Sequence, residues 1–271
     1  MKKLLKNVLL STTLMGTALT SVSVQAATDN SAINKIQETG ELRVCFEAGY
    51  VPFEMKAKNG QFIGFDIDIA RHMARSMKVK FVPVNTAWDG IIPALQTGKC
   101  EVIIGGMTVT PLRNLQVLFS DPYLEIGQTV LLSPELKGVV KSYRDLNDPK
   151  YTISSQLGTT GAEAAQKYLP KATLNLFETS ADAALQVKNG KADAFVYDLP
   201  YNAIYAAEHK DSVFHLNTPF TYEPLGWAVR HDSVTFVNFL NNYLKRIKGD
   251  GTYQRIYSKW FESHTWMKNI Q

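Results

Sequence analysis

The sequence has few of the residues that bind metals. Its five histidines and two cysteines show none of the spacings that are typical of zinc or other metal sites, so we expect no metal and no cofactor. After the N-terminal region, no segment is long and apolar enough to span a bilayer. We find no repeat of fixed period and no low-complexity stretch. These absences argue against a metalloprotein, an integral membrane protein and a repeat architecture.

The chain also has little net charge once its N-terminus is set aside. The formal charge is +4, from 29 basic and 25 acidic residues. Three of the basic residues, Lys2, Lys3 and Lys6, precede residue 27, and no acidic residue does. Residues 27–271 therefore carry 26 basic and 25 acidic residues and a charge of +1. We expect no nucleic-acid-binding surface on such a chain, and its composition is that of an ordinary globular protein.

Residues 1–26 have the three parts of a secretory signal peptide. The lysines are followed by an apolar and small-residue stretch over 8–19, and then by Val24-Gln25-Ala26, a small-x-small cleavage site. A membrane anchor is the alternative, but the apolar stretch is short for a span. No cysteine lies near the cleavage site, so a lipid anchor is not supported. We expect an exported protein whose mature chain begins at Ala27.

Two cysteines in an oxidising compartment would by default form a disulfide. Cys45 lies in a predicted strand at 42–47, and Cys100 directly precedes another at 101–105. If these strands are parallel neighbours that end at one edge, the cysteines are offset by ~3 residues, or ~10 Å along the sheet. Because a disulfide needs Cα atoms within ~7 Å, we expect two small buried thiols and no bridge.

Strands and helices alternate along the chain, which predicts an α/β protein with mainly parallel sheets. A first run has strands at 42–46, 80–84 and 102–104 and helices at 66–76 and 90–96. A second run has strands at 151–154, 172–177 and 194–197 and helices at 161–169, 180–188 and 202–208. Residues 236–261 are helical and rich in aromatics, with a break at Gly249-Asp250-Gly251.

Two apolar, β-prone segments, 126–132 and 225–229, separate these runs from each other and from the C-terminal helices. The most economical interpretation is a first lobe formed by residues 27–126 and 226–271, with a second lobe, 127–225, inserted into it. The two β segments then act as a hinge. Two lobes simply in series are the alternative, but that arrangement leaves the C-terminal helices without a partner.

A free amino acid needs a bidentate cation for its carboxylate, a carboxylate for its ammonium group and a pocket for its side chain. Gly105 and Gly106 directly follow a predicted strand, where glycine lets the backbone approach a ligand closely. Thr108 and Arg113 come next, and a guanidinium group matches the geometry of a carboxylate. A surface ion pair is the alternative role for Arg113.

Two further strand ends carry suitable groups. Thr160 lies in the segment 158–161 at a predicted helix N-terminus, where free backbone N–H groups attract anions, although it could also be only an N-cap. Asp198 ends a strand at the edge where α/β sheets bind ligands, or it caps the next helix. For Asp66 and Asp68 we expect only helix N-terminal charge and capping.

Several motifs, in order along nearly the whole mature chain, resemble those of the polar amino-acid-binding receptors of ABC importers, bacterial solute-binding protein family 3. They are Glu47-Ala48-Gly49-Tyr50-Val51-Pro52-Phe53, Gly64-Phe65-Asp66-Ile67-Asp68, Trp88-Asp89-Gly90-Ile91-Ile92-Pro93-Ala94-Leu95, Gly106-Met107-Thr108 with Arg113, Phe119-Ser120-Asp121-Pro122-Tyr123, Gly158-Thr159-Thr160, Asp250-Gly251-Thr252-Tyr253 and Lys259-Trp260-Phe261. The resemblance implies the two-lobe α/β fold of periplasmic binding proteins (type II), hinged by two β crossings. It also implies a periplasmic location, a monomer, a free L-amino acid as ligand and an inner-membrane ABC permease complex as partner.

The resemblance also assigns roles to the site residues. Arg113 and the backbone around Thr108 and Thr160 would hold the ligand carboxylate, and Asp198 would accept hydrogen bonds from its ammonium group. Relatives often carry serine in the strand-end pair, where this chain has Gly105 and Gly106, so we expect only backbone contacts to the ligand there.

Aromatic and acidic residues would surround the side chain of the ligand. Tyr50 and Trp88 would flank it, although packing in the core is the commoner role of aromatics. Glu47, at the end of the first strand, would face its far end and favour a side chain with N–H donors: arginine, lysine, histidine or glutamine. A second carboxylate, as in glutamate or aspartate, would be repelled. A surface position is the alternative for Glu47.

Two other functions remain open from the sequence. An enzyme on the same scaffold, such as a periplasmic cyclohexadienyl dehydratase, is the main alternative to a receptor, because a fold does not determine a function. The argument against an enzyme is that Arg113 and Asp198 together complement both charged groups of an amino acid. In addition, no histidine or cysteine that could act as a catalytic group lies near the predicted cleft. An extracellular sensor or adhesin with the same lobes is the third hypothesis.

Overall fold

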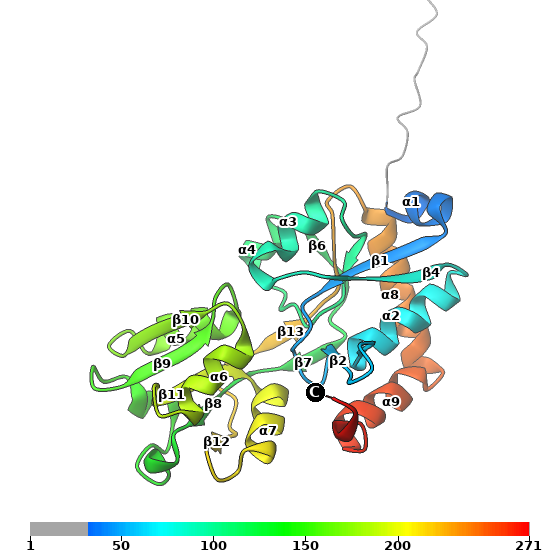
Figure 1. The fold of residues 1–271 in the computed structure, drawn as a ribbon. Coiled ribbons are helices and arrows are strands. Elements are labelled where there is room, and N and C mark those ends of the chain that lie inside the picture. The colour runs from blue at the N-terminus through cyan, green and yellow to red at the C-terminus, as the bar shows by residue number, and fades with distance from the viewer. Residues whose placement is uncertain (1–31, 271) are drawn as a thin grey trace, which may run out of the picture.

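The computed structural model describes residues 32–270 of the chain. The signal peptide expected at residues 1–26 lies outside this range. Figure 1 shows two α/β lobes, each built on its own sheet, with a pair of strands running between them. Within residues 32–270, no helix is long and apolar enough to cross a membrane. The same residues contain no group of three or more His, Cys, Asp or Glu side chains that could hold a metal ion.

Lobe 1 is built on a five-stranded sheet in the order β4-β1-β5-β14-β6. Its strands are β1 (Glu41–Phe46), β4 (Lys80–Asn85), β5 (Val102–Ile103), β6 (Leu118–Phe119) and β14 (Ala228–Val229). Strand β1 pairs in parallel with β4 and β5, whereas β14 is antiparallel to β5 and β6. The helices of this lobe are α1 (Ala32–Thr39), α2 (Phe65–Ser76), α3 (Ile91–Gln96), α4 (Pro111–Asn114), α8 (Val234–Gly249) and α9 (Thr252–Tyr257).

Short elements complete lobe 1. A small hairpin pairs β2 (Met55–Lys56) with β3 (Phe62–Ile63). Single helical turns lie at Trp88–Gly90 (η1), Ser258–Glu262 (η4) and Met267–Asn269 (η5). The second of these is a π-helical turn.

Lobe 2 is built on a second five-stranded sheet in the order β10-β9-β11-β8-β12. Its strands are β8 (Gln128–Leu132), β9 (Thr152–Gln156), β10 (Thr173–Phe177), β11 (Ala194–Asp198) and β12 (Phe214–Leu216). Strand β9 is parallel to β10 and β11, and β8 is antiparallel to β11 and β12. The helices are α5 (Thr160–Tyr168), α6 (Ser180–Lys188) and α7 (Leu199–Glu208), and two 3₁₀ turns lie at Pro134–Leu136 (η2) and Tyr143–Leu146 (η3).

The two lobes are joined by antiparallel strands, β7 (Leu124–Ile126) and β13 (Glu223–Leu225). The chain leaves lobe 1 on β7, builds the second sheet and returns on β13 to β14 in the first sheet. After this return, α8 and α9 pack on lobe 1, where Tyr253 donates a hydrogen bond to the carbonyl of Tyr123 over 2.8 Å. The two predicted β crossings are therefore present.

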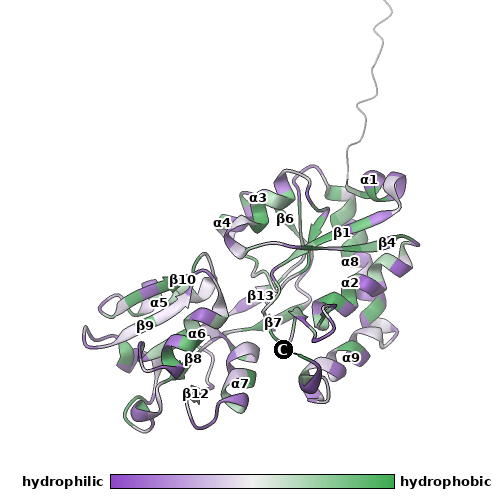
Figure 2. Cartoon of the chain, viewed as in Figure 1, coloured by the Kyte–Doolittle hydropathy of each residue, from purple (hydrophilic) through white to green (hydrophobic). Residues whose placement is uncertain are grey.

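Hydrophobic periodicity accounts for these elements. In α2, Ile67, Ala70 and Ala74 lie on the buried face, as their spacing predicts, and the predicted helix is confirmed. All residues of β8 and β11 are buried, because both strands lie inside a sheet that is covered by helices. Figure 2 shows the helices as bands of green apolar and purple polar residues, as expected of helices with one buried face. The predicted C-terminal break is also confirmed, since α8 ends at Gly249 and α9 begins at Thr252.

The prediction of two free thiols was wrong, because Cys45 and Cys100 form a disulfide. The offset was estimated correctly, since Cys45 lies opposite Ile103 in the β1–β5 register. However, β5 has only two residues, and the chain bends at Glu101 before it joins the sheet. The backbone N–H of Glu101 donates to the carbonyl of Arg43 over 3.0 Å, and the two cysteine Cα atoms are 5.7 Å apart. The estimate failed because it assumed a straight strand before residue 102.

Candidate functional site

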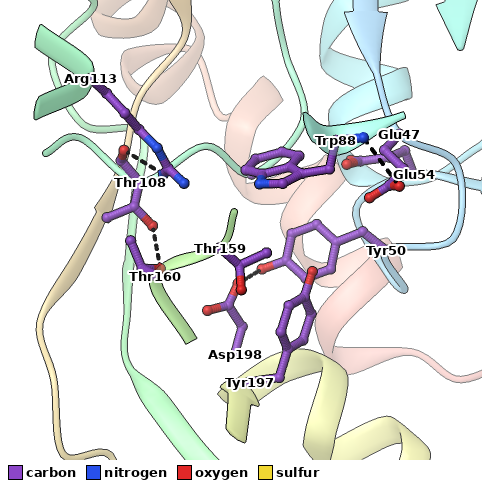
Figure 3. A pocket seen from close by; sticks show the side chains of 11 residues that line it. Glu47, Tyr50, Glu54, Trp88, Thr108, Arg113, Thr159, Thr160, Tyr197 and Asp198 are labelled. Atoms are coloured by element: carbon purple, nitrogen blue, oxygen red, sulfur yellow. Dashed lines mark hydrogen bonds between the residues drawn. The ribbon is translucent and has the colours of Figure 1, made fainter. Parts of the chain in front are cut away.

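A cavity lies between the two lobes and takes its walls from both. Its free volume is about 20 Å³, roughly the space of one water molecule, because side chains of the two lobes contact each other across it. Figure 3 shows the side chains around it. The lining residues are Glu47, Tyr50, Glu54, Trp88, Gly106, Thr108, Arg113, Thr159, Thr160, Tyr197 and Asp198. Of the nine residues expected from the sequence, all but Gly105 line this cavity.

Arg113 reaches the cavity from α4 in lobe 1. Pro111 starts this short helix, and the hydroxyl of Thr110 accepts the backbone N–H of Arg113, which fixes the turn. The guanidinium group is buried and donates to the carbonyls of Thr108, over 2.9 Å, and of Gly158 in lobe 2, over 3.2 Å. Arg113 is therefore not in a surface ion pair. Burial lowers the pKa of Arg113, and the nearby carboxylates oppose this shift.

Asp198 approaches from lobe 2, at the end of β11. It occupies the N-cap position of α7 but makes no capping hydrogen bond. Instead, its carboxylate accepts hydrogen bonds from the hydroxyl of Tyr50 in lobe 1 and from Nε2 of Gln128, the latter over 2.6 Å. Gln128 lies directly opposite Asp198 in the β8–β11 register. Burial raises the pKa of Asp198 to about 7, and the hydrogen bond from Tyr50 opposes this shift.

Two threonine hydroxyls face each other between Arg113 and Asp198. The Oγ1 atoms of Thr108 in lobe 1 and Thr160 in lobe 2 are 3.3 Å apart. The N-cap of α5 is Thr159, whose hydroxyl accepts the backbone N–H of Ala162. Thr160 is thus the first residue of the helix, and the alternative that it is only an N-cap was wrong. Its hydroxyl is directed at the cavity, beside the free backbone N–H groups of the helix start.

Glu47 lies at the opposite end of the cavity and is partly buried, so the surface alternative was wrong. Its Oε2 atom accepts a hydrogen bond from Nε2 of Gln156 in lobe 2 over 2.7 Å. Its Oε1 atom accepts the backbone N–H of Trp88 over 3.3 Å. Burial is the largest cause that raises the pKa of Glu47 above its ordinary value, and the hydrogen bond from Gln156 opposes it.

The two aromatic residues combine packing with a place in the cavity wall. Tyr50 stacks on Phe53, with ring centroids 4.4 Å apart, and its edge faces the cavity. Trp88 lies beside the guanidinium group of Arg113, at 5.4 Å from the ring centroid, which is a cation–π distance. Its indole N–H donates to the carbonyl of Gly158 over 3.0 Å. Tyr50 thus packs in the core and also lines the site.

A model of the bacterial extracellular solute-binding proteins, family 3, matches residues 42–263. The chain belongs to this family. Arginine-binding protein 1 of an ABC transporter of Escherichia coli is 32% identical over 220 residues, which are 79% of this chain and 88% of that protein. The cyclohexadienyl dehydratase of Pseudomonas aeruginosa is 25% identical over 245 residues, 90% of each chain.

Solved structures of family relatives share the fold. A binding component of an ABC transporter from Wolinella succinogenes, complexed with lysine, is 46% identical, with a TM-score of 0.82, over 85% of this chain and 99% of that one. An ancestral amino-acid-binding protein, described as a precursor of cyclohexadienyl dehydratase, is 48% identical, with a TM-score of 0.81, over 85% of this chain and 100% of that one. The two-lobe α/β fold expected from the sequence is confirmed.

In this family 3 protein, Asp66 has a role that its sequence pattern does not predict. The N-cap of α2 is Gly64, and no side chain caps it, so the expected capping by Asp66 and Asp68 was wrong. Asp66 is fully buried and accepts hydrogen bonds from the backbone N–H of Gly106 over 2.9 Å and from the hydroxyl of Tyr123 over 2.8 Å. Burial raises the pKa of Asp66 to about 7. It holds the backbone of Gly106 against the cavity.

The glycine pair makes room for neighbouring side chains. Gly106 has a φ of 61°, and a Cβ atom there would overlap the ring of Tyr50. A Cβ atom at residue 105 would lie close to Phe46 and Glu54, and Gly105 does not line the cavity.

Three residues that line the cavity were not predicted from the sequence: Glu54, Thr159 and Tyr197. Gln128 and Gln156, which donate hydrogen bonds to Asp198 and Glu47, were not predicted either. Both are polar residues in buried strands, which is a signal that the sequence offers.

Proposed function

We propose that this protein is a receptor that binds a free L-amino acid between its lobes and delivers it to an ABC transporter permease. The observation that carries the proposal is the pairing of one buried cation, Arg113 from lobe 1, with one buried carboxylate, Asp198 from lobe 2, around a single cavity. A zwitterionic amino acid presents the complementary pair of charges. Relatives named as amino-acid-binding proteins of ABC transporters support this proposal.

Both charged groups keep hydrogen-bonding capacity for a ligand. The guanidinium group of Arg113 has five N–H donors, and its side chain uses Nη1 and Nη2 for one carbonyl each. The carboxylate of Asp198 has about four acceptor positions, of which Tyr50 and Gln128 occupy one each. The ligand carboxylate is assigned to Arg113 with Thr108 and Thr160, and the ligand ammonium group is assigned to Asp198.

The charge of the cavity favours a ligand with a cationic side chain. Its lining holds three carboxyl groups, those of Glu47, Glu54 and Asp198, and one cation, Arg113. The α-carboxylate and α-ammonium groups of any amino acid cancel each other, so a positive side chain is needed to balance the remaining acidic groups. We therefore propose arginine, lysine or histidine as ligand, with glutamine as the neutral candidate.

Contacts between the lobes support a closing mechanism. Besides the bonds to Asp198 and Glu47 described above, both Trp88 and Arg113 donate to the carbonyl of Gly158 across the cleft. These bonds join lobe 1 to lobe 2 only when the cleft is closed. The proposal is that lobes open and close about β7 and β13, that the closed form docks on the permease, and that the protein acts in the periplasm after its signal peptide is removed.

The test is a binding screen on ligand-free protein. Thermal unfolding in the presence of each common amino acid should identify the ligand, because ligand at 100 times its Kd stabilises the folded state by about 2.7 kcal/mol. Titration calorimetry then gives the affinity for the amino acids that raise the melting temperature. If no amino acid raises it and none binds by calorimetry, the proposal is wrong.

An enzyme of the dehydratase type is the second candidate. The dehydratase relative and the buried carboxyl of Asp198, whose pKa is raised to about 7, favour it, since such a group could donate a proton. The argument against an enzyme is that a free amino acid carries the two charges that complement Arg113 and Asp198. Turnover of a cyclohexadienyl substrate, together with no binding of any amino acid, would decide for the enzyme.

A further inference from the structure

Gln128 is a fully buried polar residue at the point where the chain enters lobe 2 from the hinge. It begins β8, directly after Gly127 and the crossing strand β7. Its backbone N–H donates to the hydroxyl of Thr221 over 2.9 Å, and its carbonyl accepts the backbone N–H of Phe220 over 3.0 Å. Both partners shortly precede the returning strand β13. The segments that lead into and out of lobe 2 therefore hold the backbone of Gln128 together.

The side-chain amide of Gln128 donates hydrogen bonds to two residues of the ligand cavity. Its Nε2 atom lies 2.6 Å from Oδ1 of Asp198 and 3.2 Å from Oγ1 of Thr160. The reverse orientation of the amide is unfavourable, because it would place the amide oxygen, which only accepts, against the carboxylate. Gln128 itself does not line the cavity. It therefore lies behind the two lobe 2 residues that are assigned to the charged groups of the ligand.

The other side of this amide is left without a partner. Within residues 32–270, no group donates to the buried Oε1 atom of Gln128, and such an atom is costly to bury. An apolar side chain at this position would avoid the cost. Gly161 leaves the space that the amide needs, because a Cβ atom there would lie 3.0 Å from Oε1. A buried amide with one unpaired side indicates that the hydrogen bonds on its other side have a function.

Gln128 stays beside Asp198 when the lobes separate. Of the two side chains that donate to this carboxylate, Tyr50 belongs to lobe 1 and Gln128 belongs to lobe 2. The opening motion proposed above breaks the bond from Tyr50 and leaves the bond from Gln128 intact. Asp198 is therefore already oriented by Gln128 when a ligand enters the open cleft.

The titratable and charged groups that face Asp198 come from both lobes and the hinge: Tyr50, Arg113, Tyr197 and Glu223. Burial raises the pKa of Asp198 to about 7, and the hydrogen bonds from Tyr50 and Gln128 oppose this shift. The charge of Glu223 raises this pKa as well, whereas the charge of Arg113 lowers it. Because an amide donor favours the ionised carboxylate, loss of the bond from Gln128 would raise the pKa of Asp198 further.

The second hydrogen bond of the amide sets the direction of the Thr160 hydroxyl. A hydroxyl group has one proton to donate and two acceptor positions. Because Gln128 fills an acceptor position of Thr160, the proton of Thr160 points away from Gln128, toward the cavity side where Oγ1 of Thr108 lies 3.3 Å away. A hydroxyl that accepts a hydrogen bond is also a stronger donor. Thr160 is thus oriented to donate to a carboxylate in the cavity.

We infer that Gln128 is a positioning residue that prepares lobe 2 for the ligand. It presents Asp198 as an acceptor for the ligand ammonium group and the hydroxyl of Thr160 as a donor for the ligand carboxylate. This inference rests on the proposed function and adds to it a residue outside the cavity wall. Because the α-ammonium and α-carboxylate groups are common to all amino acids, Gln128 strengthens binding without selecting among ligand side chains.

The test compares Gln128→Met with the wild type by calorimetric titration of lysine, of glutamine and of any other amino acid that binds in the screen described above. Methionine keeps the length of the side chain and removes its N–H donors. Affinity should fall by roughly tenfold to a hundredfold at pH 7, the range for hydrogen bonds to charged groups, and by similar factors for each amino acid. The fall should be larger at pH 6 than at pH 8, because the pKa of Asp198 is raised further.

The matched control is Gln166→Met, the same change at an exposed position of α5 in lobe 2, which should leave all affinities unaltered. A merely structural role for Gln128 predicts a different result. It would lower the melting temperature of Gln128→Met and leave the pH dependence of binding as it is in the wild type.

The outcomes separate this inference from the proposed function. If the wild type binds no amino acid, the proposed function is wrong and the inference falls with it. If the wild type binds an amino acid and Gln128→Met binds it with unchanged affinity or unchanged pH dependence, only the role of Gln128 is overturned. A fall for lysine alone would also overturn that role, because it would point to the ligand side chain.

A measurement on the wild type covers the case in which Gln128→Met does not fold. In the ligand-free protein, the Nε2 protons of Gln128 should exchange with solvent far more slowly than those of the exposed Gln166, and their NMR signals should shift when lysine binds. Proton NMR with assigned side-chain amides measures both effects. If the protons of Gln128 exchange as fast as those of Gln166, the bonds to Asp198 and Thr160 do not persist before binding, and the inference is overturned.

Discussion

Removal of the disulfide between Cys45 and Cys100 should strongly destabilise lobe 1. The bridge closes a loop with a sequence separation of 55 residues. In the chain-entropy model, a loop of this length restricts the unfolded chain by about 4 kcal/mol at 25 °C. Both cysteines are fully buried in lobe 1, so the change should be to alanine, which adds no buried hydroxyl group. For a chain of this size, the loss corresponds to a fall in melting temperature of roughly 8–16 °C.

The assay is urea unfolding of the ligand-free protein, followed by tryptophan fluorescence with and without reductant. The oxidised wild type should unfold at a clearly higher urea concentration than the Cys45→Ala/Cys100→Ala variant. Reductant should lower the midpoint of the wild type and leave that of the variant unchanged. If the oxidised wild type and the double variant unfold at the same urea concentration, or if mass spectrometry finds two free thiols in the oxidised protein, the reasoning is refuted.

The remaining predictions concern ligand binding. Arg113→Ala and Asp198→Ala should each abolish detectable amino-acid binding, because each leaves a charged ligand group unpaired in a buried cleft, at a cost of roughly 2–5 kcal/mol. Near-normal affinity by calorimetry would remove that residue from the site. Small-angle scattering should give a smaller radius of gyration with ligand than without, whereas identical profiles at saturation would indicate a rigid pocket. Glu47→Gln should weaken a cationic ligand by roughly 1.5–3 kcal/mol and glutamine by less. If the wild type and Glu47→Gln rank arginine, lysine, histidine, glutamine and glutamate in the same order of affinity, Glu47 does not determine the ligand preference. Burial raises the pKa of Asp198 to about 7, and ammonium binding favours its ionised form. Affinity measured from pH 5 to pH 8 should therefore rise up to about pH 7 and then level off, and a constant affinity between pH 5 and pH 7 would contradict this.

Much of the fold could be predicted from the sequence because its signals are local. The spacing of Ile67, Ala70 and Ala74 marks the buried face of α2 within one segment of chain. The apolar runs of β8 and β11 likewise mark strands that are buried on both faces. Asp198 could be assigned to the ligand-binding edge because β11 ends there and α7 follows.

Other features depend on contacts between distant segments, and only the tertiary structure decided them. The disulfide forms because the chain bends at Glu101 before the two-residue strand β5, a backbone detail with no local sequence signal. Asp66 binds the backbone of Gly106, 40 residues away, and does not cap α2. Glu54 looks like an ordinary charged residue after a turn, yet folding brings Asp66 and Glu47 beside it and buries all three groups to different degrees. Burial and unpaired hydrogen-bonding groups depend on what surrounds a side chain in space, so a sequence pattern does not determine them.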